Sequence, residues 1–344
     1  MDELELIEEA RGLSRREILA AGGLVAAGAT MLGAPAAAFA RGTRARAGTT
    51  TKVAVVTHGD TGAFWSVFKH GVDQAKKDLS SRGLSVTQVY ANNDVAKQVA
   101  GLNAAIAAKV NVIATSVPDP SALKGSLVNA SKKGIEVITV NSGLGAFDGS
   151  PGSVANLPTY MTHVGQTEEI AGEGAGKQFN AAGAKSVVVI IHEAANVGLT
   201  QRAAGVKKTF KGKTSTLLLP NAKSDIPGTV AKVKAYFASH RDTDAMLGLD
   251  PDVTVPCIAA APKGAKIGTF DLSGDVIKNI ESGKMLFAID QQQYLQGYLP
   301  VVFAVLFVTN LNTVGGGQPI LTGPGFVNKA NAAKVAALAS KGTR

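Results

Sequence analysis

The feature that most constrains the fold of this chain is a regular alternation of short apolar segments with segments of helical periodicity, which begins at Thr51. Residues 52–57, KVAVVT, are typical of a buried parallel strand because the segment is apolar and rich in β-branched residues. Apolar residues then recur at helical spacing from Phe64 to Leu79 and stop before Gly83. Further strands are predicted at 85–90, 112–115 and 136–140, and further helices at 95–108 and 123–133. This series predicts a parallel sheet with helices on both faces.

The segment from Asn141 to Pro158 interrupts the alternation with glycine and proline, and we interpret it as a crossing between two lobes followed by an exposed loop. The apolar segment 298–311 is too short to span a bilayer and contains Pro300, so a helix packed on a sheet is expected. The fold class is therefore α/β, with two doubly wound parallel-sheet lobes in series. In the second lobe, helices are predicted at 168–182, 202–210, 229–239 and 275–282, and strands at 186–192, 214–219, 245–249, 266–270 and 285–289.

The first forty residues have the pattern of an export signal. Arg15 and Arg16 precede an uncharged, alanine- and glycine-rich run from Ile18 to Ala40, which ends in the small-x-small sequence Ala-Phe-Ala. The arrangement resembles a twin-arginine signal cleaved after Ala40, although residues 2–9 are acidic for such a signal. A permanent transmembrane anchor is the alternative, but alanine and glycine contribute little insertion energy. We expect a protein exported to the periplasm or to the exterior of the cell envelope.

Charge and cysteine content exclude two further classes. Residues 1–40 hold three of the 35 basic and six of the 26 acidic residues, so the remainder carries 32 basic against 20 acidic groups. Such an excess can indicate nucleic-acid binding. The lysines, however, are spread over predicted helix faces, so we interpret them as solvated surface and expect no nucleic-acid partner. Cys257 is the only cysteine, which excludes a disulfide framework, and no His–acid pair is visibly arranged to make it a catalytic thiol.

Motifs of common enzymes are absent from the sequence. Gly143, Gly145 and Gly149 follow a predicted strand, but Pro151-Gly152 follows where a dinucleotide fingerprint needs a helix start. Neither a phosphate-binding GxxxxGK[ST] nor a GxSxG motif occurs, and the five histidines never pair at i+2 or i+4 as local metal ligands do. His192-Glu193 is interpreted as a polar pair at a strand end. We expect no catalytic residue, no metal and no cofactor.

Several segments share their order and spacing with one known family. THGDTGAFW at 57–65 opens the first helix, and EVITVN at 136–141, VGQTEEIAG at 164–172 and AIDQQQYLQG at 288–297 follow. Together they resemble the type I periplasmic sugar-binding proteins, the ribose- and galactose-binding-like substrate-binding proteins of ABC importers, across residues 52–329. The resemblance implies a non-enzymatic, monomeric receptor that closes on a sugar, polyol or cyclitol and delivers it to an ABC transporter membrane permease. A sensory receptor for a sugar-like signal molecule and an enzyme on a similar two-lobed frame are the alternatives.

The same resemblance implies a three-strand hinge, with crossings near Asn141, Gln291 and Thr322. The domain boundaries that follow are a signal peptide at 1–40, a linker at 41–50, an N-terminal lobe of 51–141 with 292–321, and a C-terminal lobe of 142–291 with 322–344.

The resemblance also assigns roles to individual residues. Phe64 and Trp65 would stack on the C–H face of a sugar, or else be core residues of the first helical turn. Asp119 would accept hydrogen bonds from ligand hydroxyls, or else only cap the next helix. Arg202 would donate a forked pair of hydrogen bonds to the ligand, or else be a surface arginine. Asp271 matches a family aspartate at a strand end.

Some positions depart from the family pattern and bear on the ligand. His58 stands where pentose binders often have serine, Gly62 where they have asparagine, and Asn141 where aspartate is frequent. These departures suggest a ligand other than plain ribose, such as a polyol, a cyclitol or a modified sugar. The complete set of predicted ligand-binding residues is His58, Asp60, Phe64, Trp65, Asp119, Asn141, Arg202, Asp250, Asp271 and Gln291.

Overall fold

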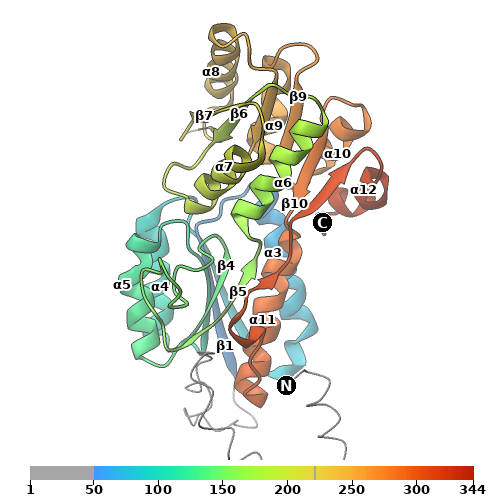
Figure 1. Ribbon diagram of the computed structural model, residues 1–344. Helices are drawn as coiled ribbons and strands as arrows, with labels where there is room; N and C mark the ends of the chain where they lie inside the picture. The colour runs from blue at the N-terminus through green and yellow to red at the C-terminus, as the bar shows by residue number, and fades with distance from the viewer. Residues whose placement is uncertain (1–49, 221) are drawn as a thin grey trace, which may run out of the picture. The chain divides into compact units, whose positions relative to one another are not determined.

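The computed structural model describes residues 50–220 and 222–344. The predicted export signal lies outside the described residues, as does the predicted linker apart from its last residue. The described chain forms two six-stranded sheets, each packed between helices (Figure 1). This arrangement confirms the predicted α/β class with two parallel-sheet lobes.

The first lobe is built on a parallel sheet of β1 (Thr51–Thr57), β2 (Leu84–Tyr90), β3 (Val112–Ser116), β4 (Glu136–Asn141), β5 (Tyr160–Gly165) and β11 (Ile320–Leu321). Their order across the sheet is β11-β5-β4-β3-β1-β2. The helices of this lobe are α3 (Ala63–Asp78), α4 (Val95–Ala107), α5 (Pro120–Lys132) and α11 (Gln293–Asn310).

The second lobe repeats the plan with the order β12-β10-β9-β8-β6-β7. Its strands are β6 (Ser186–Ile191), β7 (Lys213–Leu218), β8 (Ala245–Gly248), β9 (Lys266–Phe270), β10 (Phe287–Asp290) and β12 (Gly325–Asn328), of which β12 alone pairs antiparallel. Its helices are α6 (Glu168–Ala181), α7 (Val197–Thr209), α8 (Ile226–Ser239), α9 (Pro251–Cys257), α10 (Gly274–Glu281) and α12 (Ala332–Ser340).

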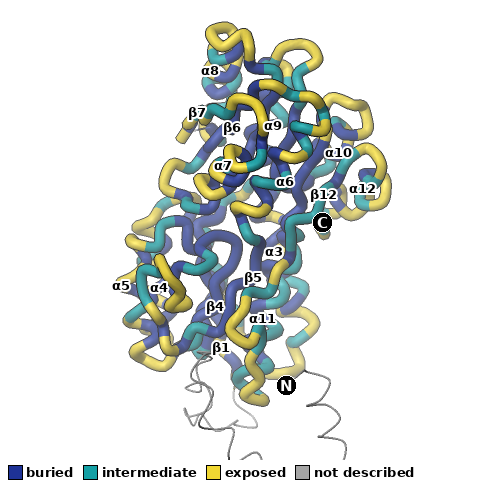
Figure 2. Tube along the Cα trace, in the orientation of Figure 1, coloured by how far each residue is buried: buried dark blue, intermediate teal, exposed yellow. Residues whose placement is uncertain are grey.

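Each sheet is buried on both faces, as the apolar runs in its strands require (Figure 2). Strand β1 shows how this works, because successive side chains point to opposite faces. Val53 and Val55 pack in the cluster beneath α3 and α11, whereas Ala54 and Val56 pack in the cluster beneath α4 and α5. A helix layer therefore covers each face of the sheet.

Glycines allow two helix pairs to approach closely, one pair in each lobe. A Cβ added at Gly71 of α3 would collide with the Tyr294 carbonyl of α11, and one added at Gly297 would collide with the Phe68 carbonyl. Gly172 of α6 and Gly205 of α7 face each other's helix in the same way. These positions need glycine because a backbone carbonyl occupies the space of the missing side chain.

The first crossing between the lobes differs from the prediction. Strand β5 pairs with β4 in the first sheet, so the chain crosses at Gln166–Thr167 and not near Asn141. The glycine-rich segment does not leave the lobe, because Phe147 and Leu157 are buried in its core. Residues 142–167 therefore belong to the first lobe, contrary to the predicted boundary.

Two further crossings lie near the carboxyl end of the chain. One joins β10 to α11 through Gln291 and Gln292, and the other joins β11 to β12 through residues 322–324. Helix α11 contains the apolar segment with Pro300 and packs against α3 in the first lobe's core. Over residues 50–220 and 222–344, no helix combines the length and apolarity that a membrane span requires.

Candidate functional site

Polar residues from both lobes gather where the strands end. His58 follows β1 and Asn141 ends β4 in the first lobe, whereas Asp250, Asp271 and Gln291 follow β8, β9 and β10 in the second. All five are buried, with at most 6% of their surface exposed. In open α/β sheets, ligands bind outside the carboxyl ends of the strands. The five residues therefore mark a candidate binding site between the two sheets.

His58 connects the two lobes. Its Nδ1 lies 2.7 Å from Ser116 Oγ at the end of β3. Its Nε2 lies 3.6 Å from Glu193 Oε2 and 3.5 Å from Asn196 Nδ2, both in the second lobe. Burial lowers the pKa of His58 more than the neighbouring carboxylate of Glu193 raises it. The imidazole is therefore neutral near pH 7, where it can both donate and accept a hydrogen bond.

The loop and helix start that follow β6 supply the matching groups of the second lobe. Burial alone raises the pKa of Glu193, but hydrogen bonds and charge from His192 and His58 lower it below its usual range. Asn196 caps α7. Its Oδ1 also accepts a hydrogen bond from Ser142 Oγ of the first lobe, at 3.1 Å. The backbone N–H of Val197 donates to the Pro118 carbonyl across the same gap, at 3.0 Å. The amino end of α7 is thus joined to the first lobe.

The two aromatic residues of the first helical turn lie at the edge of this network. Trp65 is 4% exposed, and its ring contacts His58 edge-on at 4.9 Å between centroids. It also packs against Phe64 and Phe68, at 4.8 and 5.2 Å. Both Phe64 and Trp65 belong to the core of the first lobe, as the alternative interpretation holds. Their stacking on a ligand stays a prediction.

Arg202 is buried, so the interpretation as a surface residue is wrong. It is 4% exposed on α7, and its guanidinium carbon lies 4.3 Å from the centroid of the Phe270 ring. Its Nε and one terminal nitrogen donate to the two carboxylate oxygens of Glu168, at 2.7 and 3.0 Å. The remaining nitrogen approaches the Leu249 carbonyl at 3.4 Å. The forked pair of donors predicted for a ligand is therefore already used within the protein.

Asp271 and Gln291 form a second buried pair. Gln291 Nε2 donates to Asp271 Oδ1 at 2.8 Å, and Gln291 Oε1 is buried without a hydrogen-bond partner among the described residues. Asp271 has a φ of +67°, a left-handed conformation that aspartate tolerates better than most residues. Burial raises the pKa of Asp271 well above its usual value, and the charge of Arg202 opposes this only in part. The carboxyl group is poised to take a donor from a ligand.

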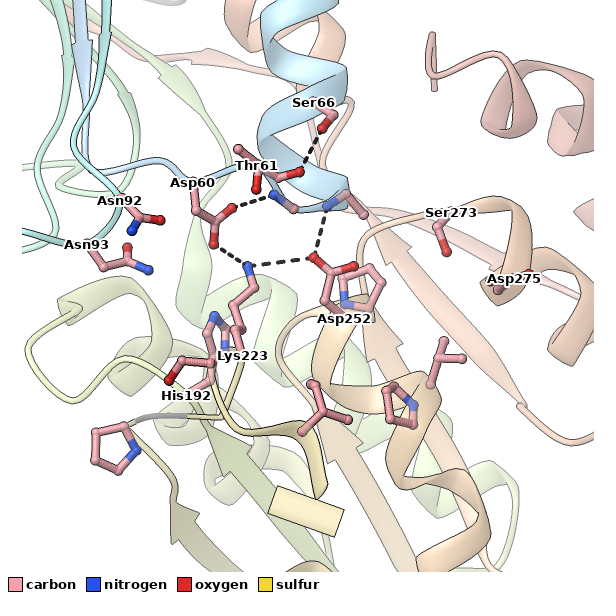
Figure 3. Close-up of a pocket in the computed structure, with 18 residues that line it drawn as sticks. Asp60, Thr61, Ser66, Asn92, Asn93, His192, Lys223, Asp252, Ser273 and Asp275 are labelled. Atoms are coloured by element: carbon pink, nitrogen blue, oxygen red, sulfur yellow. Dashed lines mark hydrogen bonds and ion pairs between the residues drawn. The ribbon is translucent and has the colours of Figure 1, made fainter. Parts of the chain in front are cut away.

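A cavity of about 930 Å³ opens beside the network, at the lobe junction (Figure 3). Lys223, from the loop after β7, lines the cavity, with Nζ 2.7 Å from Asp60 Oδ2 and 2.8 Å from Asp250 Oδ2. Asp252 Oδ2 lies 3.8 Å from the same nitrogen and accepts a hydrogen bond from the Ala63 N–H at 2.9 Å. Asp60 and Asp250 were predicted as site residues, whereas Lys223 and Asp252 were not.

Asp119 has a local role in the structure. Its Oδ1 accepts a hydrogen bond from the Ala122 N–H at 3.0 Å and caps α5, as the alternative interpretation holds. In the described part of the chain, the structure gives Asp119 no other partner among the predicted site residues. Its contact with a ligand stays a prediction.

Sequence reasoning missed several residues of the network. Two signals could have found some of them: Glu193 and Asn196 follow β6 directly, and Ser142 follows β4. The pairing of Arg202 with Glu168 had no local signal, because 34 residues separate them. Among the described residues, no group of three His, Cys, Asp or Glu side chains is placed to hold a metal ion.

Comparison with known proteins identifies the family to which this chain is similar. The model of the periplasmic binding protein domain matches residues 53–310. A carbohydrate transporter from Acidothermus cellulolyticus, solved with myo-inositol, is 32% identical, with a TM-score of 0.78, and the match covers 86% of this chain and all of that one. A Caulobacter myo-inositol binding protein shares the fold at 20% identity and a TM-score of 0.70, covering 85% of this chain and 98% of that one. The xylose/arabinose-binding protein XylF of Sulfolobus acidocaldarius is 26% identical over 294 residues, which are 82% of this chain and 72% of that protein.

Proposed function

The chain belongs to the periplasmic binding protein domain family, and we propose that it is an exported solute-binding protein that captures a small polyhydroxylated ligand between its lobes and delivers it to an ABC importer. The ligand is a sugar, a polyol or a cyclitol. A cyclitol of the inositol type is the first candidate, because a relative at 32% identity was solved with myo-inositol. The residues at His58, Gly62 and Asn141 depart from the pattern of pentose binders, which favours a ligand other than plain ribose without selecting among polyols, cyclitols and modified sugars.

One observation carries the proposal: buried polar groups lie at the strand ends of both lobes, and His58 of the first lobe joins Glu193 and Asn196 of the second in one network. A ligand hydroxyl is both a donor and an acceptor, so it needs partners of both kinds. The network offers acceptors in Glu193 and Asp271, and Gln291 Oε1 and His192 Nδ1 are buried with no partner in the described part of the chain. A buried polar atom without a partner costs free energy. Ligand hydroxyls that pair with such atoms would gain what the free protein lacks.

Closure follows from the topology. The chain passes between the lobes three times, at Gln166–Thr167, Gln291–Gln292 and residues 322–324, and these segments can act as a hinge. A ligand that contacts both lobes shifts the population toward the closed form, which a membrane permease can recognise. No covalent step is needed, and a monomer suffices for this mechanism.

A thermal-shift screen of a protein that lacks residues 1–40 tests the proposal. At a concentration of 100 Kd, a ligand that binds only the folded state adds about 2.7 kcal/mol of stability, which raises Tm by several degrees. We expect such a rise with myo-inositol, and we would screen xylose, arabinose, ribose and linear polyols beside it. No rise with any member of the panel would contradict the proposal.

A matched pair of variants locates the binding site. Asp271→Asn should abolish or reduce the ligand-induced rise, because it replaces a buried acceptor at the end of β9. Asp94→Asn is the control, since Asp94 also follows a strand but is only partly buried and caps α4 by accepting the Lys97 N–H. An equal rise in both variants would remove Asp271 from the site.

Export through the twin-arginine route is part of the proposal and rests on the sequence. Replacing Arg15 and Arg16 with lysine should stop secretion of the full-length chain, because that pathway depends on the arginine pair. Unchanged secretion of the double variant would reject this route.

A further inference from the structure

Lys223 lies where the two lobes meet. Its ammonium group contacts Asp60 of the first lobe at 2.7 Å and Asp250 of the second lobe at 2.8 Å. A second link runs in parallel, from Asp252 of the second lobe to the N–H of Ala63 in the first (Figure 3). Four groups from two lobes thus form one cluster.

The two carboxylates nearest to Lys223 are each held by a backbone N–H of their own lobe. Asp60 accepts the N–H of Gly62 on Oδ1, at 2.8 Å, and gives Oδ2 to Lys223. Asp250 accepts the N–H of Asp252 on Oδ1, at 2.7 Å, and likewise gives Oδ2 to Lys223. Both acceptors are therefore oriented in advance, so little side-chain freedom is lost when the ammonium group arrives.

The cluster lies directly against Gly62, the N-cap of α3. A side chain at Gly62 would collide with Asp252 and press on Lys223. The side chains of Lys223, Asp60 and Asp250 are 19%, 10% and 6% exposed, so solvent ions screen their attraction only weakly. Burial lowers the pKa of Lys223, but the charges and hydrogen bonds of Asp250 and Asp60 raise it by a larger amount. The side chain therefore stays charged.

The charges in the cluster explain why Lys223 alone can hold the three carboxylates together. Three carboxylates surround a single ammonium group, and removing that group would leave them facing one another across the lobe junction. Asp252 already shows this crowding, because burial and the charge of Asp250 raise its pKa. Breaking one partner out of a buried ion cluster is costly because the remaining charges stay uncompensated.

We propose that Lys223 is a clasp between the lobes, which holds them together in the absence of ligand and so positions the binding loops before the ligand arrives. The inference rests on the proposed function only in assuming that the lobes open and close. Other contacts across the junction, such as His58 with Glu193, act beside the clasp. The free protein therefore populates the closed arrangement beside the open one, and a ligand shifts the population further toward the closed form.

Distance measurements on ligand-free protein test the clasp. Spin labels on Lys124→Cys in α5 and Lys207→Cys in α7 report the separation of the lobes, because both positions are exposed. Cys257 is fully buried, so the introduced cysteines are the reactive ones. The protein is unfolded and refolded to remove bound ligand, and the distances are read by double electron–electron resonance.

Lys223→Met should move the distribution toward the longer, open distance, with a fall in the closed-to-open ratio of roughly 30-fold, as for loss of one partner of a buried charge pair. Asp60→Asn should act in the same direction, because it removes only the first-lobe partner. Lys266→Met is the matched control, since Lys266 pairs with Asp244 at 2.8 Å within the second lobe. That variant should keep the wild-type distribution.

An unchanged distance distribution in folded Lys223→Met, checked by circular dichroism, would overturn the clasp. So would an equal change in the Lys266→Met control. Neither result depends on which compound binds, because no ligand is present. Conversely, a failed ligand screen leaves the distance result intact, so the two proposals fail separately.

Discussion

Removing the charge of Glu168 should strongly destabilise the second lobe. Its carboxylate is 1% exposed and receives both forked donors of Arg202, whose side chain is 4% exposed. Burial lowers the pKa of Arg202 and Glu168 raises it. Arginine stays protonated in proteins even without such a partner, so the guanidinium remains charged in the variant. Glu168→Gln would leave that charge buried without its main partner. Breaking a buried pair in this way costs about 3–5 kcal/mol.

Urea unfolding of the protein without residues 1–40 measures this loss. The free energy of unfolding of Glu168→Gln is compared with that of the wild type, using the same slope against denaturant. Glu173→Gln is the matched control on the same helix, because Glu173 also pairs with a basic residue of α7, Lys208, whose side chain is 60% exposed. Solvent screens an exposed pair, so the control should lose far less stability.

The result also bears on the ligand. A loss in Glu168→Gln no larger than in the control would show that Arg202 does not depend on Glu168. The nearby carboxyl of Asp271 would then be its effective partner, or the guanidinium would be free to turn toward a ligand, as the family resemblance implies. A large loss would instead assign the forked donors of Arg202 to the fold.

Three further predictions follow from burial and packing. Asp271→Asn should raise the free energy of unfolding at neutral pH while it weakens ligand binding, because burial raises the pKa of this carboxyl and so disfavours its charged form; denaturation and calorimetry measure the two effects. Burial lowers the pKa of His163 to about 3, from 6.5, so only the unfolded chain takes up its proton as the pH falls from about 6.5 to 3. The wild type should therefore lose about 2 kcal/mol more than His163→Asn between about pH 7.5 and about pH 5, by denaturation at both values. Gly71→Ala should cost about 1–3 kcal/mol, since its Cβ would collide with the Tyr294 carbonyl; an unchanged melting temperature would contradict this.

The sequence predicts the alternation of strands and helices well, because a strand buried on both faces must be apolar along its whole length. Strand β5, which the prediction missed, shows where this rule stops. Its sequence, YMTHVG, places His163 inside the sheet, where Nδ1 lies 3.0 Å from Thr139 Oγ1. A polar residue that pairs within the core looks like a loop residue in the sequence. The first crossing was misplaced because β5 was missed and the glycine- and proline-containing segment before it was interpreted as the crossing.

The candidate site also contains residues that could be predicted from the sequence and residues that could not. Residues at strand ends were predictable, because the carboxyl edge of a parallel sheet gathers whatever follows each strand. Their partners were not predictable, since pairing depends on how two lobes meet. Lys223 lies in a loop with no motif, and the carboxylates that it contacts come from segments far away along the chain. Asp252 was not predicted as a site residue for another reason: it lies in α9, and that helix was itself not predicted.

The pairing of the buried cations limits what the site can bind. Arg202 and Lys223 are each held by carboxylates of the chain, so neither offers an uncompensated positive charge to a ligand. An anionic ligand would have to break one of these ion pairs to reach a cation. Its negative charge would then lie close to the carboxylates of that pair and be repelled by them. The unpaired Gln291 Oε1, in contrast, can accept a hydrogen bond from a ligand hydroxyl without the loss of an ion pair. The charge arrangement therefore favours neutral polyhydroxylated ligands over sugar acids or phosphates, which agrees with a cyclitol as the first candidate.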